Sequence, residues 1–131
     1  MNVIESIKKH EGFKQKPYPD PLTGGEPYTV GYGFTYIDEN EAELVLKIKI
    51  RKIESQLRNK LLFYETLPQN QKDVLIEMAY QLGIDGLLSF KKFLKALGSR
   101  NIDEATKEMK DSRWYHQTAN RANDLIEKLK W

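Results

Sequence analysis

Three polar residues near the start of the chain, Glu11, Asp20 and Thr29, have side chains that could together hydrolyse a glycosidic bond. Eight residues lie between each of them and the next. This reaction needs one carboxylic acid to protonate the leaving oxygen, and a second group to hold or activate water or to stabilise the cationic transition state. In a chain with 19 acidic residues, two acids often look paired, so solvated surface acids remain an alternative on residue types alone.

Glu11 is positioned by a short predicted helix over residues 3–11. Asn2 can cap the first turn of this helix, and Gly12 ends it. Its apolar stripe consists of Val3, Ile4 and Ile7. Glu11 therefore sits in the last turn, where the helix dipole is negative and disfavours another negative charge. An acid placed against the helix dipole hints at a functional role, and a solvated surface Glu remains the alternative.

Asp20 and Thr29 lie in a segment rich in turn residues, PYPDPLTGGEPYTVGYG. Its Gly and Pro residues between two aromatic stretches predict a small antiparallel sheet within residues 13–36. Strand alternation leaves one face of the second strand nearly bare, which lets backbone or a ligand approach closely. The residues of this bare face are Thr29, Gly31, Gly33 and Thr35. The segment is either an ordinary hairpin or a hairpin that holds a site.

The rest of the chain is predicted to be helical. Asp38 and Glu41 form a capping-box pattern ahead of a long helix over residues 39–60. The stretch LKIKI alternates like a strand, but the cap and the length favour a helix. Thr66 is expected to cap the next helix, whose apolar sequence DVLIEMAYQLG predicts the core of a helical lobe over residues 61–131. Helix ends are predicted at Gly83 and Gly98, and further helices over residues 103–110 and 120–131. The prediction is an α+β fold, a single domain of two lobes joined by the long helix.

Composition narrows the possible classes of function. The 131-residue chain has no cysteine and only two histidines, His10 and His116, so no disulfide, metal site or cofactor is expected. A formal net charge of +2, with both signs mixed along the chain, argues against a dedicated nucleic-acid binder. No apolar run reaches the roughly 18 residues of a membrane span, and the N-terminus lacks the pattern of a signal peptide. We therefore expect a monomer that does not insert into membranes and stays in the compartment where it is made.

Three blocks of the sequence, taken in order, resemble the phage-type lysozymes. The first block runs from the EG of Glu11 through YPD to GEPYTVGYG, the second is MAYQLGIDGLLSF at residues 78–90, and the third is DSRWYHQTANRA at residues 111–122. The third block is similar to the C-terminal signature of T-even phage lysozymes. From the first block to the last, they span residues 11–122, which is most of the length of the chain. The resemblance implies a two-lobed lysozyme fold and a muramidase that cleaves the MurNAc–GlcNAc bond of bacterial peptidoglycan.

The resemblance also implies roles for individual residues. Glu11 would be the general acid, and Asp20 and Thr29 would position the attacking water in an inverting reaction. Arg121 matches an arginine that pairs with the catalytic Glu, and it would support the site together with Gly31. The implied substrate-binding residues are Tyr80, Gln81, Thr35, Phe93, Glu108, Arg113 and Gln117. Core packing remains an alternative for Tyr80, and Trp114 is expected to be a core residue.

The sequence departs from the family pattern in several places. The loop between Asp20 and Thr29 is longer, and the stretch after Phe34 is shorter, so the β lobe is expected to have little or no third strand. The family has other cleft residues at the positions of Thr35, Phe93 and Glu108. The resemblance therefore supports the predicted sugar contacts less strongly than the predicted catalytic roles.

Two alternatives to the hydrolase remain open: a lytic transglycosylase, which needs one Glu and no positioned water, and an inactive wall-binding module. The expected setting is phage lysis, with release from the host cytoplasm through a separate pore, or delivery with the virion tail.

Overall fold

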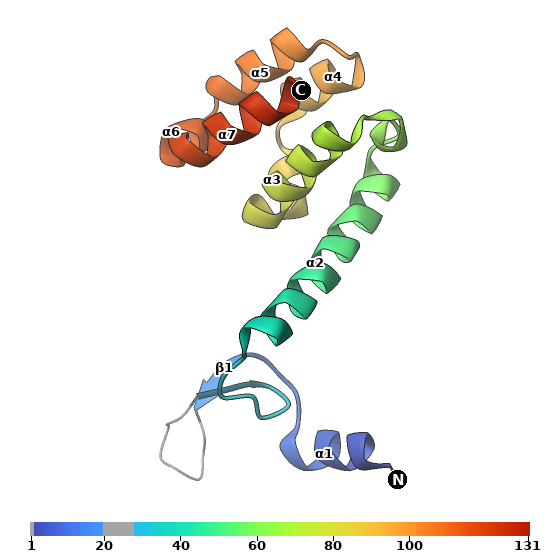
Figure 1. Ribbon diagram of the computed structural model, residues 1–131, viewed down its shortest axis with the longest axis vertical. Coiled ribbons are helices and arrows are strands. Elements are labelled where there is room, and N and C mark those ends of the chain that lie inside the picture. The colour runs from blue at the N-terminus through green and yellow to red at the C-terminus, as the bar shows by residue number, and fades with distance from the viewer. Residues whose placement is uncertain (1, 20–27) are drawn as a thin grey trace. The chain divides into compact units, whose positions relative to one another are not determined.

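The computed structural model describes residues 2–19 and 28–131 (Figure 1). Within these residues the chain forms seven α-helices and one two-stranded antiparallel sheet, which confirms the predicted α+β class. The chain divides into two compact units, an N-terminal unit of residues 1–45 and a C-terminal unit of residues 46–131. The boundary between them falls inside helix α2 (Glu39–Lys60).

The N-terminal unit begins with helix α1 (Val3–Glu11), as predicted. The Asn2 side chain accepts a hydrogen bond of 2.9 Å from the Glu5 N–H and so caps the first turn. The helix ends at Gly12, whose φ of 69° is a conformation that glycine adopts without steric cost. The stripe of Val3, Ile4 and Ile7 is exposed by 70%, 62% and 49%.

The sheet of the N-terminal unit consists of strands β1 (Lys14–Pro19) and β2 (Tyr28–Gly31). Thr29 lies opposite Tyr18, and an irregularity in register separates that pair from Lys14 and its partner. Among the described residues the only further pairing is an isolated bridge between Val30 and Phe34, in line with the expectation of a trimmed lobe.

The predicted strand alternation through Thr35 is wrong after Gly31. Gly31 and Gly33 have positive φ values of 65° and 78°, so the backbone turns where the pattern predicted a continued strand. Residues with positive φ do not continue the pleat of a strand, and glycine tolerates either conformation. Gly33 and Thr35 therefore do not extend one strand face together with Thr29.

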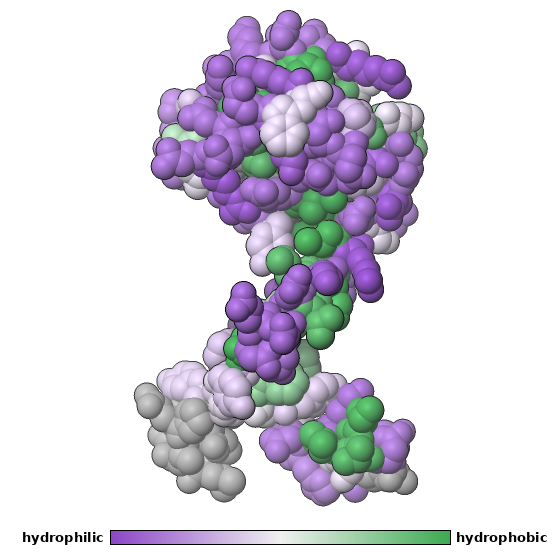
Figure 2. Space-filling view, viewed as in Figure 1, coloured by the Kyte–Doolittle hydropathy of each residue, from purple (hydrophilic) through white to green (hydrophobic). Residues whose placement is uncertain are grey.

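Helix α2 begins with the predicted capping box. The Asp38 carboxylate accepts a 2.8 Å hydrogen bond from the Glu41 N–H, and the Asp38 N–H donates to the Glu41 carboxylate at 3.2 Å. The bond from the Glu41 backbone lowers the pKa of Asp38. The LKIKI stretch is helical, and hydrophobic residues show along α2 in Figure 2. Within the described part of the chain no helix combines the length and hydropathy needed to cross a membrane.

The C-terminal unit is helical and contains the hydrophobic core. After a short 3₁₀ helix, η1 (Tyr64–Thr66), come α3 (Gln69–Leu88), α4 (Lys91–Gly98), α5 (Ile102–Lys110), α6 (Arg113–Gln117) and α7 (Ala119–Leu129). Its largest fully buried side chains are Leu57, Tyr64, Val74, Leu75, Met78, Leu87, Phe93, Leu97, Met109, Ile126 and Leu129. Side chains from the apolar stretch of α3 are among them, as predicted. Trp114, 4% exposed, is also a core residue, which confirms its expected role.

One helix boundary differs from the predictions. Thr66 does not cap α3: its hydroxyl donates to the Phe63 carbonyl at 2.6 Å, and Pro68 occupies the N-cap position without a side-chain bond. The hydroxyl is used locally by the 3₁₀ turn, which competes with capping. The helix end predicted at Gly83 is confirmed, because helical geometry breaks there, with φ 78° and ψ 161°, and a second helical segment continues from it to Leu88 within α3.

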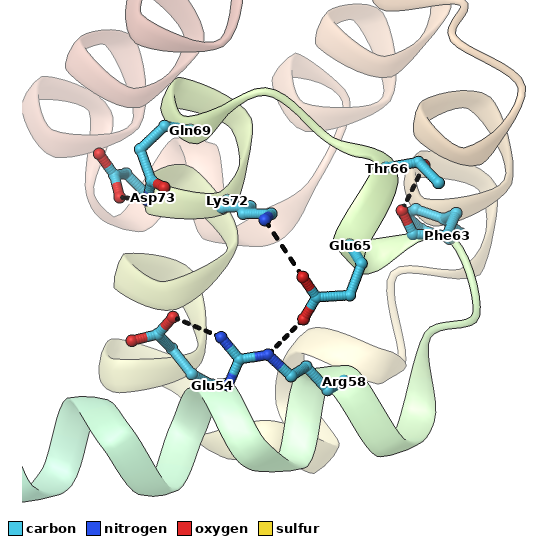
Figure 3. Close-up of polar contacts among 8 residues, drawn as sticks. All are labelled: Glu54, Arg58, Phe63, Glu65, Thr66, Gln69, Lys72 and Asp73. Carbon is cyan, nitrogen blue, oxygen red and sulfur yellow. Dashed lines mark hydrogen bonds and ion pairs between the residues drawn. The ribbon is translucent and has the colours of Figure 1, made fainter.

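A cluster of charged residues joins α2, η1 and the start of α3 (Figure 3). The Arg58 guanidinium contacts Glu65 and lies 3.4 Å from the Glu54 carboxylate, while the Lys72 ammonium lies 3.5 Å from Glu65. Both cations also lie near the Tyr64 ring, at 5.9 and 5.4 Å from its centre. The Tyr64 hydroxyl is buried without a hydrogen-bond partner, and burial raises its pKa to about 12.

We expect the Glu65→Gln variant to lose part of the acid sensitivity of the fold. The hydrogen bond from Arg58 and the charge of Lys72 hold the pKa of Glu65 below its ordinary value of 4.5. A carboxylate with a lowered pKa stabilises the fold above its unfolded-state pKa, and this stabilisation is lost as the pH falls through the folded value. Melting temperatures of the two proteins should therefore differ most above about pH 5 and converge as the pH falls through the lowered pKa of Glu65. In about 1 M salt the difference should shrink, because exposed charges are screened. Curves that stay parallel at all pH values in low salt would contradict this assignment.

Candidate active site

The Glu11 carboxylate lies against the backbone of Gly33. If Gly33 carried a Cβ atom, that atom would lie 2.5 Å from Glu11 Oε2 and 2.9 Å from Cδ. Since real Cβ contacts are not that short, the carboxylate occupies the space that a side chain at position 33 would need. Glu11 is exposed to solvent, so its carboxyl group combines a fixed neighbour with access for a ligand.

An aromatic side chain connects α1 to the segment after β2. The Tyr32 ring lies 5.6 Å from the Phe13 ring, and the Lys8 ammonium lies 5.5 Å from the centre of the Tyr32 ring. Lys8 is one turn before Glu11 on α1, and Tyr32 directly precedes Gly33. These contacts therefore bring the C-terminal end of α1 and the glycine turn to the same place.

Two further predicted residues belong to the same hairpin. Thr29 is partly buried on β2, in the strand that leads to the glycine turn. A Cβ atom at Gly31 would lie 2.7 Å from the Phe34 ring, so the turn needs a glycine there, while the predicted supporting role of Gly31 in the site stays a prediction. Asp20, the second predicted carboxylate, follows β1 in the sequence but lies outside the described residues, so its role stays a prediction.

Arg121, on α7, is bound to a carboxylate of its own unit. Its Nε donates to Glu77 Oε2 on α3 at 3.0 Å, with both side chains about two-fifths exposed. The predicted pairing of Arg121 with Glu11 stays a prediction. Tyr80 is 48% exposed and is not a core residue, which removes the alternative of core packing. Tyr80, Glu77 and Arg121 line a pocket of about 420 Å³ in the C-terminal unit, with an apolar side formed by Leu46, Ile50 and Ile76.

Gln81, predicted to contact substrate, forms a side-chain hydrogen bond within the C-terminal unit. Its Oε1 accepts a 2.9 Å hydrogen bond from the indole N–H of Trp114. Because Trp114 is buried, this bond satisfies a donor that would otherwise be unpaired in the core. Gln81 therefore fixes α3 to α6, and any contact with substrate must come from the rest of its amide.

The remaining predicted binding residues differ in exposure. Phe93 on α4 is 1% exposed, with its ring edge-on to Phe90 at 6.5 Å, so its burial argues against the predicted sugar contact. Glu108 on α5 is partly buried and lines a pocket together with Phe93. Thr35, Arg113 and Gln117 are exposed, so their proposed contacts stay predictions.

Sequence reasoning did not assign Gly33 or Glu77 to the site. Gly33 could have been found from the sequence, because it stands on the strand face that was predicted to be bare. No local pattern signals Glu77, since its partner lies 44 residues away in the chain. In residues 2–19 and 28–131 no group of three His, Cys, Asp or Glu side chains is placed to hold a metal ion.

A helix that ends in an exposed Glu beside a small hairpin, followed by a long helix and a helical unit, is a lysozyme-like α+β arrangement. The chain belongs to the phage lysozyme family, whose pattern matches residues 8–130. This confirms the resemblance seen in the three sequence blocks.

Two curated relatives come from Dictyostelium discoideum. The chain is 39% identical over 90 residues to Probable T4-type lysozyme 1, a match that covers 67% of this chain and 52% of the relative. It is 38% identical over 63 residues to Probable T4-type lysozyme 2, which covers 48% of this chain and 37% of the relative. The chain thus spans about half the length, or less, of the curated relatives that it matches.

Proposed function

We propose that this protein is a muramidase that hydrolyses the β-1,4 bond between MurNAc and GlcNAc in bacterial peptidoglycan. The observation that carries the proposal is the Glu11 carboxylate against Gly33, on the hairpin that bears Thr29, in a chain of the phage lysozyme family. An exposed carboxyl group with a fixed backbone neighbour is suited to meet a glycosidic oxygen.

The proposed reaction is a single displacement with inversion. Glu11 gives its proton to the leaving oxygen as the bond to the anomeric carbon breaks. A water molecule held by Asp20 and Thr29 attacks that carbon from the opposite face, and its proton passes to the Asp20 carboxylate. Because Gly33 has no side chain, the Glu11 carboxyl group can lie directly against its backbone.

We propose that the protein works as a monomer without a cofactor, in phage lysis with a separate pore, or carried by the virion tail. The curated relatives come from a cellular organism, so family membership alone leaves the phage setting a proposal.

Mass spectrometry of digested peptidoglycan tests the reaction. We expect new reducing ends, each with the mass of one added water, and NMR of fresh product should show the inverted anomer. Products with 1,6-anhydro ends would instead identify a lytic transglycosylase. Binding to the wall without any cleavage would identify an inactive wall-binding module.

A further inference from the structure

Tyr32 lies at the centre of a closed turn that follows β2. The Val30 N–H donates to the Phe34 carbonyl, and the Phe34 N–H donates to the Val30 carbonyl, both at 2.9 Å. Gly31 and Gly33, on either side of Tyr32, have φ of 65° and 78°. The two hydrogen bonds fix the shape of the turn from within, but they do not connect the turn to α1.

The Tyr32 ring contacts residues on both sides of Glu11 in the sequence. Lys8 precedes Glu11 by one helical turn, and its ammonium lies 5.5 Å from the centre of the Tyr32 ring. Phe13 follows Glu11 after Gly12, and its ring lies 5.6 Å from the Tyr32 ring at an angle of 54°. Both distances are typical of attractive cation–π and aromatic contacts. The ring therefore contacts the two residues that flank the proposed acid.

The place of the Glu11 carboxylate depends on where the turn lies. No residue of α1 is buried, so no buried apolar side chain fixes the last turn of this helix. The carboxylate lies against Gly33, the residue after Tyr32. If the turn moved by about 1 Å, Glu11 would lose this neighbour, and a misplacement of that size costs a catalytic group about 100-fold in rate.

We propose that Tyr32 is a positioning residue for the general acid, and this inference rests on the proposed function. Its ring joins the turn to the end of α1 and so keeps the Gly33 backbone against the Glu11 carboxylate. Tyr32 acts through Glu11 and does not contact the reacting sugar. Both contacts are made by the ring, so the phenolic hydroxyl is not required.

Two substitutions at Tyr32 test the role of the ring. Tyr32→Phe keeps both ring contacts and should keep kcat within about twofold of the wild type. Tyr32→Leu removes the ring and should lower kcat by about tenfold to 100-fold, with less than about a twofold change in KM, because it displaces the acid and leaves the contacts that bind substrate. Both variants are assayed below the onset of their thermal unfolding. An equal loss of kcat in Tyr32→Phe, or a loss confined to KM, would overturn the proposal.

Lys8→Gln tests the cation–π contact separately. It should lower kcat by about twofold to fivefold, because the contact between Tyr32 and Phe13 remains. Lys9→Gln is the matched control, since Lys9 is the next residue of α1, is also exposed, and lies over no aromatic ring in the described part of the chain. Both variants remove one positive charge from α1, so long-range attraction to an anionic wall falls equally. Equal losses of kcat in the two variants would overturn the role of the Lys8 contact.

A double variant, Tyr32→Leu with Glu11→Gln, distinguishes positioning from direct contact with the sugar. A residue that acts only through Glu11 has no further effect once the acid is absent, so the double variant should be about as active as Glu11→Gln alone. A further loss of about tenfold would place the ring against the substrate and overturn the positioning role.

NMR of the protein without substrate separates this inference from the proposed function. Glu11 Cγ lies 3.4 Å from the place that a Cβ at Gly33 would occupy, and one α-proton of Gly33 points there. A nuclear Overhauser effect between these two residues should therefore be present in the wild type and Tyr32→Phe, and lost in Tyr32→Leu. If the wild type cleaves nothing but shows this pattern, the proposed function fails and the positioning of Glu11 by Tyr32 stands. If the effect persists in Tyr32→Leu, Tyr32 does not position Glu11, whatever the enzyme cleaves.

Discussion

The Glu11→Gln variant should fold normally and lose about 10²–10⁴-fold in the rate at which it releases reducing ends from peptidoglycan. Glutamine keeps the size of the side chain but has no acidic proton to give to the leaving oxygen. The Glu11 carboxyl group is exposed and ends a helix, so its replacement removes no buried contact. The fold should therefore survive, and binding to the wall should persist.

Glu5→Gln is the matched control for this experiment. Glu5 is an exposed acid in the first turn of the same helix, so the two variants make the same change of charge on α1. Activity is measured as reducing ends released, and folding as the melting temperature and the circular dichroism spectrum. A Glu11→Gln protein with more than about a tenth of wild-type activity would exclude Glu11 as the general acid. A Glu5→Gln protein as inactive as Glu11→Gln would point to a general charge effect.

Elements whose signals are local could be predicted from the sequence. Asn2 and Gly12 delimit α1, and the reciprocal bonds of Asp38 and Glu41 begin α2, because a cap depends on only a few neighbouring residues. The same rule explains the error at Thr66. The Thr66 hydroxyl could either cap the following helix or donate a hydrogen bond to the Phe63 carbonyl. In the structure it donates to the carbonyl.

The turn after β2 could not be predicted from alternation. A glycine within an alternating pattern fits both a continued strand and a turn, because it adopts negative and positive φ equally well. The structure has positive φ at Gly31 and Gly33, and this brings Gly33 to Glu11. The sequence correctly predicted that another group lies close to the backbone at Gly33. That group is the carboxylate of Glu11, which belongs to the chain itself.

Exposure in the helical unit depends on packing between distant segments. A family resemblance assigns a position to Phe93 and Gln81, but it does not say which side chain fills the core. Phe93 is buried, and Gln81 accepts the hydrogen bond of the buried Trp114 indole. The resemblance therefore agrees with the exposed position of Glu11 at the end of α1, but not with the predicted sugar contact of the buried Phe93.

Gly33→Ala should reduce kcat/KM by about 100-fold, because a misplacement of about 1 Å has that effect on a catalytic group. The new Cβ would lie 2.5 Å from Glu11 Oε2, so one of the two must move. The carboxylate is the end of a flexible side chain and moves more easily than the backbone. The fold should therefore tolerate the methyl group while the proposed acid is displaced.

Gly83→Ala provides the matched control, because it adds the same strain without the contact. Both glycines have φ of 78°, and a Cβ at Gly83 would meet nothing within 4 Å. Each alanine should cost about 1–3 kcal/mol in the free energy of unfolding, through its backbone conformation alone. Only Gly33→Ala should also lose activity, as kcat/KM and thermal unfolding of the two variants would show.

Combining Gly33→Ala with Glu11→Gln shows whether both changes act on one group. If the methyl group introduced by Gly33→Ala lowers activity only by displacing the Glu11 carboxyl group, it should cause little further loss in a protein that already lacks the acidic proton. The double variant should then be about as active as Glu11→Gln alone, because residues in contact have non-additive effects. Losses that multiply in the double variant would mean that Gly33 acts on the reaction independently of Glu11, for example by direct contact with the sugar.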